Sequence, residues 1–338
     1  MNKLRFLAML FFVAAATLLM TGISAAADTP ADSGYKVINR IAIGGEGGWD
    51  YLTFDAASRR LFIARGTRVQ VVDVDSGKLL AEIPGLIGAH GVAIAAPAGR
   101  AVASSGRSDS ALVFDLKTLA VVGSAKTGTK PDAILFDPAT GLVAALNGGT
   151  SDVTLVDPAT ASTVASFPLT GRPETGVSDG HGKLFINLED KNAIAVVDIK
   201  ARKVLATWPM DGCDEPTGLA FDAASRRLFS SCHNNTLVVV DADTGRNVQK
   251  LTIGGRVDAA AYDASAKLIF TTNGEGNISV IRQDSADHYT SLANVPTAAG
   301  ARTVALDEQK HVLYTVANIT GTEPGAKPVF TLLVVARQ

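Results

Sequence analysis

One position in a repeating pattern of the sequence is occupied mostly by ionisable side chains. The pattern recurs about every 42 residues, and this position falls five residues before a turn that usually holds aspartate. Six of its seven occupants are ionisable, although only 19% of the chain is charged. The occupants are Asp50, His90, Asp132, Glu174, Thr217, Asp258 and Arg302. This enrichment indicates a site for a polar ligand.

A second position, ten residues after the same turn, adds further polar groups. It holds Arg65, Ser105, Asn147, Glu189, Cys232 and Asn273, with His233 one residue on. Arg107, Lys130, Arg172, Glu215 and Arg256 lie in loops nearby. The residues that we expect to bind a ligand are Asp50, Arg65, His90, Arg107, Asp132, Glu174, Glu189, His233, Asp258 and Arg302.

These residue types permit metal binding and proton transfer. His90, Asp132, Glu174 and Glu189 combine an imidazole with carboxylates, which are suitable donors for a divalent metal ion, and they are our metal-ligand candidates. The same groups suit acid–base chemistry, although the sequence does not assign a catalytic residue. The alternative is that the charges solvate a channel mouth and pair with one another.

The elements that position these residues are short strands in a repeated unit. Segments such as Val71-Val72-Asp73 and Val239-Val240-Asp241 recur with aspartate spacings of 42, 42, 41 and 43. Within residues 216–255, four alternating segments are separated by turns rich in Asp, Asn and Gly, residues that favour tight turns. Four strands in about 42 residues are typical of a propeller blade. Seven units predict an all-β, seven-bladed β-propeller.

The two ends of the repeat array are complementary. The last unit has room for three strands, the third at Val329–Val335, while Ser33–Ile38 resembles the turn and fourth strand of a unit. We expect the N-terminal strand to pair with the C-terminal blade and close the ring, which would leave no sheet edge exposed.

These repeats resemble the YVTN/YncE-like family of bacterial seven-bladed propellers over nearly all of residues 28–338. The resemblance is carried by Asp137-Pro138-Ala139-Thr140-Gly141, by Val239–Gly245, and by the pairs Leu228-Phe229 and Ile269-Phe270. The literal Tyr-Val-Thr-Asn string is absent, with Thr271-Thr272-Asn273 as an echo. The resemblance implies a fold more than an activity.

The N-terminus has the pattern of a secretory signal peptide. Lys3 and Arg5 precede an apolar run, and Ala25-Ala26-Ala27 is a small-residue cleavage site, so we expect residues 1–27 to be removed and 28–338 to form one domain. The alternative is a membrane anchor, for which the run is short. Cleavage leaves 29 basic and 33 acidic residues, a net charge of −4, which argues against nucleic acid as a partner.

These features predict a periplasmic or secreted protein without a membrane span after cleavage, and we expect a monomer. We expect its two cysteines, Cys213 and Cys232, to lie at the same end of one repeat unit. We therefore expect a disulfide between them, and the alternative is two buried thiols.

For function, we expect a small polar ligand or a partner protein to bind at the channel mouth. One alternative is an enzyme, a metal-assisted hydrolase, lactonase or lyase using His90 and nearby carboxylates. Another is a structural surface protein. No cofactor follows with certainty from the sequence, and a divalent metal ion is the candidate.

Overall fold

The structure is a computed structural model that describes residues 30–323 and 325–338. The predicted signal peptide, residues 1–27, lies outside these ranges. Within the described part of the chain, no helix is both long and apolar enough to cross a membrane.

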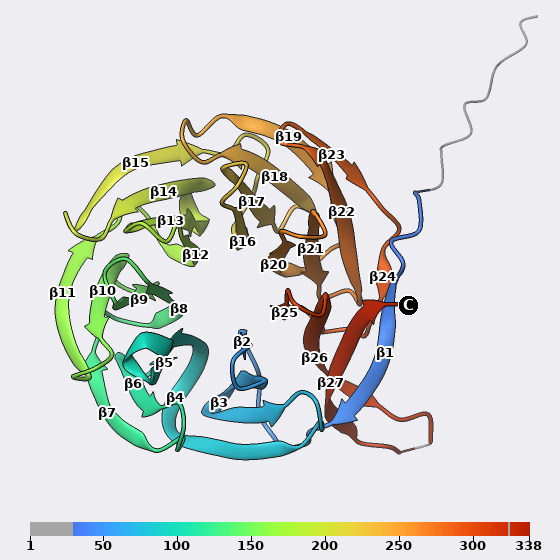
Figure 1. Ribbon diagram of the computed structural model, residues 1–338, viewed down its shortest axis with the longest axis horizontal. Helices are drawn as coiled ribbons and strands as arrows, with labels where there is room; N and C mark the ends of the chain where they lie inside the picture. The colour runs from blue at the N-terminus through green and yellow to red at the C-terminus, as the bar shows by residue number, and fades with distance from the viewer. Residues whose placement is uncertain (1–29, 324) are drawn as a thin grey trace, which may run out of the picture.

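The strands form six antiparallel sheets arranged around a central axis (Figure 1). The first group in chain order is β2 (Leu52–Asp55), β3 (Arg60–Asp73), β4 (Leu79–Ala95), β5 (Arg100–Ser105), β6 (Ser110–Asp115) and β7 (Val121–Lys126). The next two sheets are β8 (Pro131–Asp137), β9 (Leu142–Asn147), β10 (Asp152–Asp157) and β11 (Ser162–Pro168), then β12 (Pro173–Ser178), β13 (Lys183–Leu188), β14 (Ala193–Asp198) and β15 (Lys203–Pro209).

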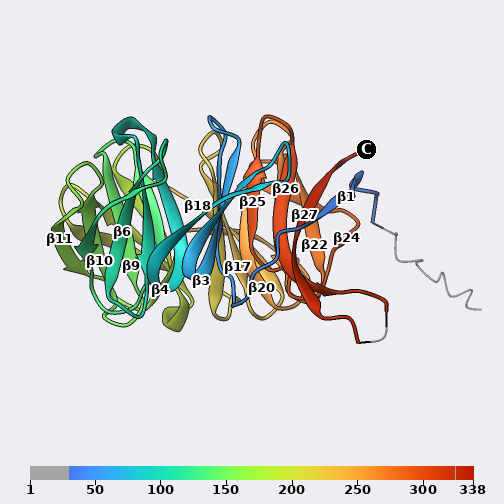
Figure 2. The ribbon, with the colours of Figure 1, turned by 90° about the horizontal axis from the view of Figure 1, so that it is seen from below.

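Three further sheets complete the circle. They are β16 (Pro216–Asp222), β17 (Arg227–Cys232), β18 (Thr236–Asp241) and β19 (Asn247–Thr252), then β20 (Val257–Asp263), β21 (Leu268–Asn273), β22 (Asn277–Ser285), β23 (His288–Ser291) and β24 (Val295–Pro296), and finally β25 (Val304–Asp307), β26 (Val312–Thr320), β27 (Pro328–Arg337) and β1 (Tyr35–Ala42). Seen from the side, the strands run between two faces that carry the loops (Figure 2). The all-β propeller prediction is confirmed.

The prediction of seven separate blades is not confirmed, because residues expected to form two blades belong to one six-stranded sheet. Its third strand, β4, is 17 residues long. The first part of β4 pairs with β3 and its last part, from Ala89 to Ala95, pairs with β5. This continuous strand joins the outer edge of one unit to the inner strand of the next.

The N-terminal strand pairs with the C-terminal sheet, as expected from the repeat pattern. β1 is antiparallel to β27, from Tyr35 opposite Arg337 to Ala42 opposite Thr331. β27 therefore has a partner on both sides, and β1 forms the outer strand of this sheet (Figure 1). The pairing satisfies backbone groups of β27 that would otherwise form an open edge.

The hydrophobic core lies between neighbouring sheets. Phe185 of β13 packs in a cluster with Leu219 of β16 and Leu228 of β17. The ring of Phe229 packs at a tilt against Tyr262 of the following sheet, with ring centroids 5.1 Å apart. Each such side chain contributes about 1.5–3 kcal/mol when fully buried. This packing fixes each sheet against the next and so fixes the positions of the strands that surround the axis.

Candidate functional site

Five strands that surround the axis have a break in regular pairing near one face of the propeller, which we call the top face. In β4, for example, Ala89 pairs with Ser105 and the next pair is Val92 with Ala103. Between such pairs stand His90–Gly91, Asp132–Ala133, Glu174–Thr175, Thr217–Gly218 and Asp258. Breaks of this kind redirect side chains and are frequent beside functional sites. They fall on the ionisable position found in the sequence.

Side chains of neighbouring strands hold the backbone at this position. The hydroxyl of Ser104 donates a 2.6 Å hydrogen bond to the carbonyl oxygen of Asp132, and the amide of buried Asn187 donates one of 3.0 Å to that of Thr217. Thr303 Oγ1 likewise donates to the carbonyl oxygen of Asp50 at 3.0 Å. The irregular segments are therefore fixed before any ligand binds.

Asp50, His90 and Asp132 converge at the channel mouth and form what we call the triad. His90 Nδ1 donates to Asp50 Oδ2 at 2.7 Å and lies 3.5 Å from Asp132 Oδ1. One donor atom from each residue lies within 4.8 Å of the others. The hydrogen bond to Asp50 is the main cause of a raised pKa for His90, which burial opposes. The imidazole therefore lies between two acidic groups.

The carboxyl groups at the channel mouth lie close enough to affect one another's pKa. Burial raises the pKa of Asp132 to about 6. The charge of His90 opposes this rise, and the charges of Asp50 and Asp258 add to it. Burial also raises the pKa of Glu174 well above its usual range, with further contributions from Asp132, Asp258 and Glu189. For Asp258 burial again raises the pKa, while Arg302 opposes the rise. Shifts in this direction are typical of functional sites.

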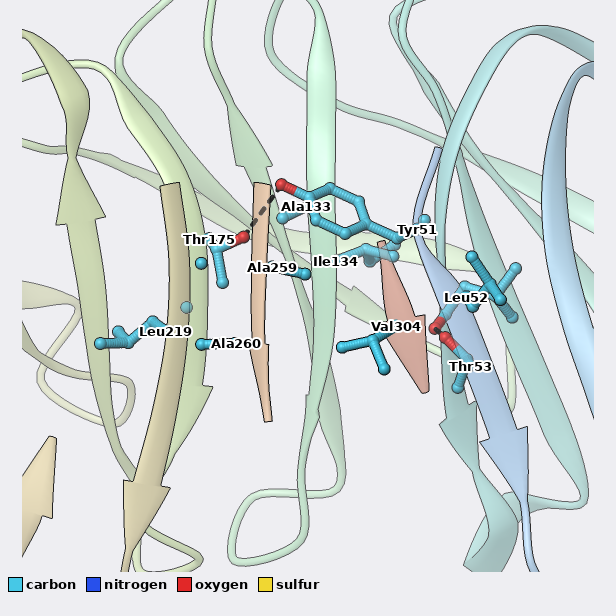
Figure 3. Close-up of a pocket in the computed structure, with 14 residues that line it drawn as sticks. Tyr51, Leu52, Thr53, Ala133, Ile134, Thr175, Leu219, Ala259, Ala260 and Val304 are labelled. Atoms are coloured by element: carbon cyan, nitrogen blue, oxygen red, sulfur yellow. Dashed lines mark hydrogen bonds between the residues drawn. The ribbon is translucent and has the colours of Figure 1, made fainter. Parts of the chain in front are cut away.

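Tyr51 also belongs to the site, although the sequence analysis missed it. Its hydroxyl donates to Glu174 Oε1 at 3.0 Å. The same hydroxyl contacts Thr175 Oγ1 at 2.9 Å across the channel (Figure 3). The position after the ionisable residue is otherwise filled by Gly, Ala or Thr. Tyr51 occupies the axis beside a cavity of about 170 Å³ that inner-strand residues such as Thr53, Ala133 and Val304 line. The sequence signal that could have found Tyr51 is a single aromatic residue at a repeat position otherwise held by small residues.

A second part of the mouth is built around Arg302. Its Nε donates to Asp258 Oδ2 at 2.6 Å, and Nη2 donates to the carbonyl oxygen of Trp49 at 3.1 Å. The guanidinium also lies 5.5 Å from the centre of the Trp49 ring. Asp258 and Arg302 line a cavity of about 460 Å³ together with His233 and Arg256.

A third cavity, of about 500 Å³, opens beside the triad. Its lining includes His90 and Asp132 on the inner side and Arg107 and Lys130 on the outer side. Arg107 and Lys130 are exposed and form no ion pair with any residue that the structure describes. A volume of this size is in the range of small-molecule pockets. The carboxylate of Asp109 also lines it, so the cavity brings acidic and imidazole groups together with these two cations.

The four predicted metal ligands do not come together in one cluster. His90 and Asp132 join Asp50, whereas Glu189 joins Glu215 and His233 in a separate group. Glu189 also pairs with Arg172 at 2.8 Å. The reason is that Glu189 begins the short helix η2 (Glu189–Lys191), in the turn after β13, and lies outside the inner strands. Glu174 is engaged by Tyr51 instead.

Arg65 was predicted to bind ligand, but its guanidinium is used inside the protein. Nη1 and Nη2 each donate a 2.7 Å hydrogen bond, to the carbonyl oxygens of Gly47 and Gly45. The guanidinium also lies 3.6 Å from the centre of the Phe330 ring, and the residue is 1% exposed. The same sequence position is buried in several other units, with the occupants Ser105, Asn147, Cys232 and Asn273. This second position is thus mainly structural.

The predicted disulfide between Cys213 and Cys232 is present, with Cα atoms 5.5 Å apart. It fixes the loop before β16 to the end of β17. His233 follows directly, and its Nδ1 lies 2.9 Å from Glu215 Oε2. The bond therefore supports the outer cluster of Glu189, Glu215 and His233 on the top face.

Comparison with known proteins identifies the architecture. Similar solved structures include a chain of hydrazine synthase from Kuenenia stuttgartiensis, with 15% identity, a TM-score of 0.70 and coverage of 81% of this chain and 93% of that one. A chain from the mitotic checkpoint complex covers 98% of this chain and 99% of its own length at 13% identity and a TM-score of 0.74. The fold is a β-propeller.

The WD40 repeats of RRP9 give a TM-score of 0.75 at 12% identity, covering 91% of this propeller and 99% of that chain. Identities this low show the fold alone. No protein-family profile matches this propeller, and no curated protein sequence does.

Proposed function

We propose that this protein is an exported propeller that binds a small polar ligand at the channel mouth of its top face, and that the ligand brings positive charge. The observation that carries the proposal is the charge balance at the mouth. Four carboxyl groups, from Asp50, Asp132, Glu174 and Asp258, face two basic side chains, His90 and Arg302. Burial is the main cause of the raised pKa of Asp132 and Glu174, and repulsion between carboxylates adds to it; a bound cation would offset both effects.

Export is supported by the N-terminal pattern and by the disulfide, since such bonds persist in oxidising compartments. Seven repeat units are supported by the cavity on the axis, to which seven separate segments contribute residues, such as Tyr51, Gly91 and Val304. In this interpretation the six-stranded sheet contains two units. Kinship with the YVTN/YncE-like proteins is supported by the repeat residues quoted above.

An enzyme is the second candidate, of the hydrolase, lactonase or lyase type. The observation that favours it is the contact between His90 and Asp132, whose pKa of about 6 suits proton transfer near neutral pH. Turnover of a bound compound, followed by mass spectrometry, would separate this candidate from a pure binding protein.

The proposal is tested by a thermal-shift screen of small amines, amino acids, sugar acids and divalent cations. A compound that raises the melting temperature should lose this effect in Asp132→Asn, which removes a charge but keeps the shape. Glu82→Gln is the matched control, since Glu82 is a carboxylate of β4 that pairs with Arg68 away from the inner strands. If every active compound acts equally on wild type and Asp132→Asn, the ligand binds elsewhere.

A further inference from the structure

We propose that the triad of Asp50, His90 and Asp132 holds a divalent transition-metal ion with one coordination position open to the neighbouring cavity. This inference rests on the proposed function, because it identifies the positive charge at the channel mouth as a metal ion. The donor set is one imidazole nitrogen and two carboxylate oxygens, within 4.8 Å of one another.

The distances suit a single ion. Two donors bound at about 2.1 Å in tetrahedral geometry lie roughly 3.4 Å from each other. His90 Nδ1 is already 3.5 Å from Asp132 Oδ1 and 2.7 Å from Asp50 Oδ2. The contact with Asp50 must lengthen, as the proton that makes this hydrogen bond is replaced by the ion. The carboxylate oxygens of Asp50 and Asp132 lie within 4.8 Å of each other, so a small side-chain adjustment brings all three donors to one ion.

The three donors also come from parts of the fold that are fixed independently. The carbonyl oxygen of Asp50 accepts a hydrogen bond from Thr303, and that of Asp132 accepts one from Ser104. The carbonyl oxygen of His90 accepts the backbone N–H of Tyr51 at 3.0 Å. The other edge of the imidazole is close-packed, because a Cβ added at Gly106 would lie 2.8 Å from His90 Nε2. Nδ1 is therefore held toward the two carboxylates.

The chemistry of the donors restricts the metal. Ca²⁺ and Mg²⁺ prefer sites made entirely of oxygen, whereas imidazole with carboxylates suits Zn²⁺ and its neighbours Mn²⁺, Co²⁺ and Ni²⁺. Three protein ligands and an open position are typical of metal sites that bind an exchangeable ligand. His90 and Asp132 line the cavity of about 500 Å³ that also exposes Arg107 and Lys130. An anionic group on the metal would face these cations.

The outer cluster of Glu189, Glu215 and His233 is the competing location. Its donors also lie within 4.8 Å of one another. However, Arg172 is bound to Glu189 at 2.8 Å and supplies positive charge there. The side chains of His233 and Glu215 are 42% and 54% exposed, against 32% and 31% for His90 and Asp132. His90 and Asp132 of the triad are thus less exposed to solvent than His233 and Glu215, and the negative charge of the triad is less neutralised by a neighbouring cation.

Titration with Co²⁺ and Zn²⁺ after treatment with a chelator tests the inference. Co²⁺ should produce visible ligand-field bands at one ion per chain, and Zn²⁺ should displace it. His90→Ala and Asp50→Asn should weaken binding by more than the roughly 10–100-fold that follows loss of a supporting residue around a metal. His233→Ala tests the outer cluster, and His288→Ala, at a surface residue whose side chain is 70% exposed, is the background control.

The variants are compared with wild type in metal-free buffer by thermal melting, so that a folding defect is recognised. His90→Asn serves in place of His90→Ala if the latter unfolds. Absence of Co²⁺ bands in wild type, or binding lost in His233→Ala and kept in His90→Ala, would overturn the inference. An organic amine that binds the chelator-treated protein would leave the proposed function intact while removing the metal from it.

Discussion

The buried carboxylate of Asp307 is paired with the guanidinium of Arg59, a residue 248 positions earlier in the chain. Asp307 is the last residue of β25, and Arg59 lies in the turn before β3, so the ion pair joins the last sheet to the first. Arg59 also binds Asp75 at 3.0 Å. Together with the β1–β27 ladder, this contact holds the two ends of the propeller together.

Substitution of Arg59 by Ala should lower the free energy of unfolding by about 3 kcal/mol, because it leaves the Asp307 carboxylate buried without its charged partner. Urea denaturation followed by circular dichroism measures the change. Arg282→Ala is the matched control, since its partner Asp284 lies at the surface and such pairs contribute about 0–1 kcal/mol. Equal effects of the two substitutions would refute a closing role for Arg59.

Deletion of residues 28–44 tests the contribution of β1 to closure. The deletion exposes the outer edge of β27 and removes Tyr35, whose ring lies 5.0 Å from Phe270 of β21. We expect a lower melting temperature and aggregation through the open edge. The two are measured by scanning calorimetry and light scattering. An unchanged melting temperature without added aggregation would contradict the closure.

Replacing Glu174 by Gln should stabilise the protein at pH 8 and have little effect at pH 5. The pKa of Glu174 is raised in the folded state, so folding favours the protonated carboxyl, and ionisation at higher pH costs stability. Gln resembles the protonated form and can still accept the hydrogen bond from Tyr51. Melting temperatures at both pH values provide the measurement.

Glu82→Gln, in contrast, should lower the stability of the protein at pH 8. Hydrogen bonds from Gln70 and Arg68 lower the pKa of Glu82, so its charged form contributes stability above its unfolded pKa and that contribution is lost at low pH. If Glu174→Gln and Glu82→Gln shift the melting temperature in the same direction at pH 8, ionisation of Glu174 does not destabilise the fold.

Loss of the disulfide should lower the free energy of unfolding by about 3 kcal/mol, because the bond closes a loop between cysteines 19 positions apart and so restricts the unfolded chain. The double substitution Cys213→Ser with Cys232→Ser avoids a single reactive thiol. Denaturant unfolding of the variant and of wild type, without reductant, gives the difference. A double variant as stable as wild type in these conditions would show that the fold holds this loop without the bond.

The repeat was predictable because its signals are local. Turn residues such as Asp241 and Gly245 recur in register with the strands, so the strands of residues 216–255 lie where the sequence placed them, within two residues. The merging of two units into one sheet was not predictable, since the continuity of β4 depends on its pairing with both β3 and β5.

The candidate site could be predicted in part for a related reason. Position in the repeat placed Asp50, His90 and Asp132 at the starts of inner strands, and regular packing of the sheets brings these starts together. Asp50 and Tyr51 stand just before β2, and the contact of Tyr51 with Glu174 across the channel depends on how the sheets pack around the axis. The burial of Arg65 depends on the Gly45–Gly48 loop folding over it, which no local pattern reveals.

The central claim is that the channel mouth binds a polar ligand through the inner carboxyl groups and His90. Thermal-shift titration of wild type, His90→Ala and Glu174→Ala with the strongest compound from the screen tests it most directly. The predicted result is a concentration-dependent stabilisation of wild type that both variants lose while remaining folded. Full affinity in both variants would contradict the account and place the site elsewhere on the propeller.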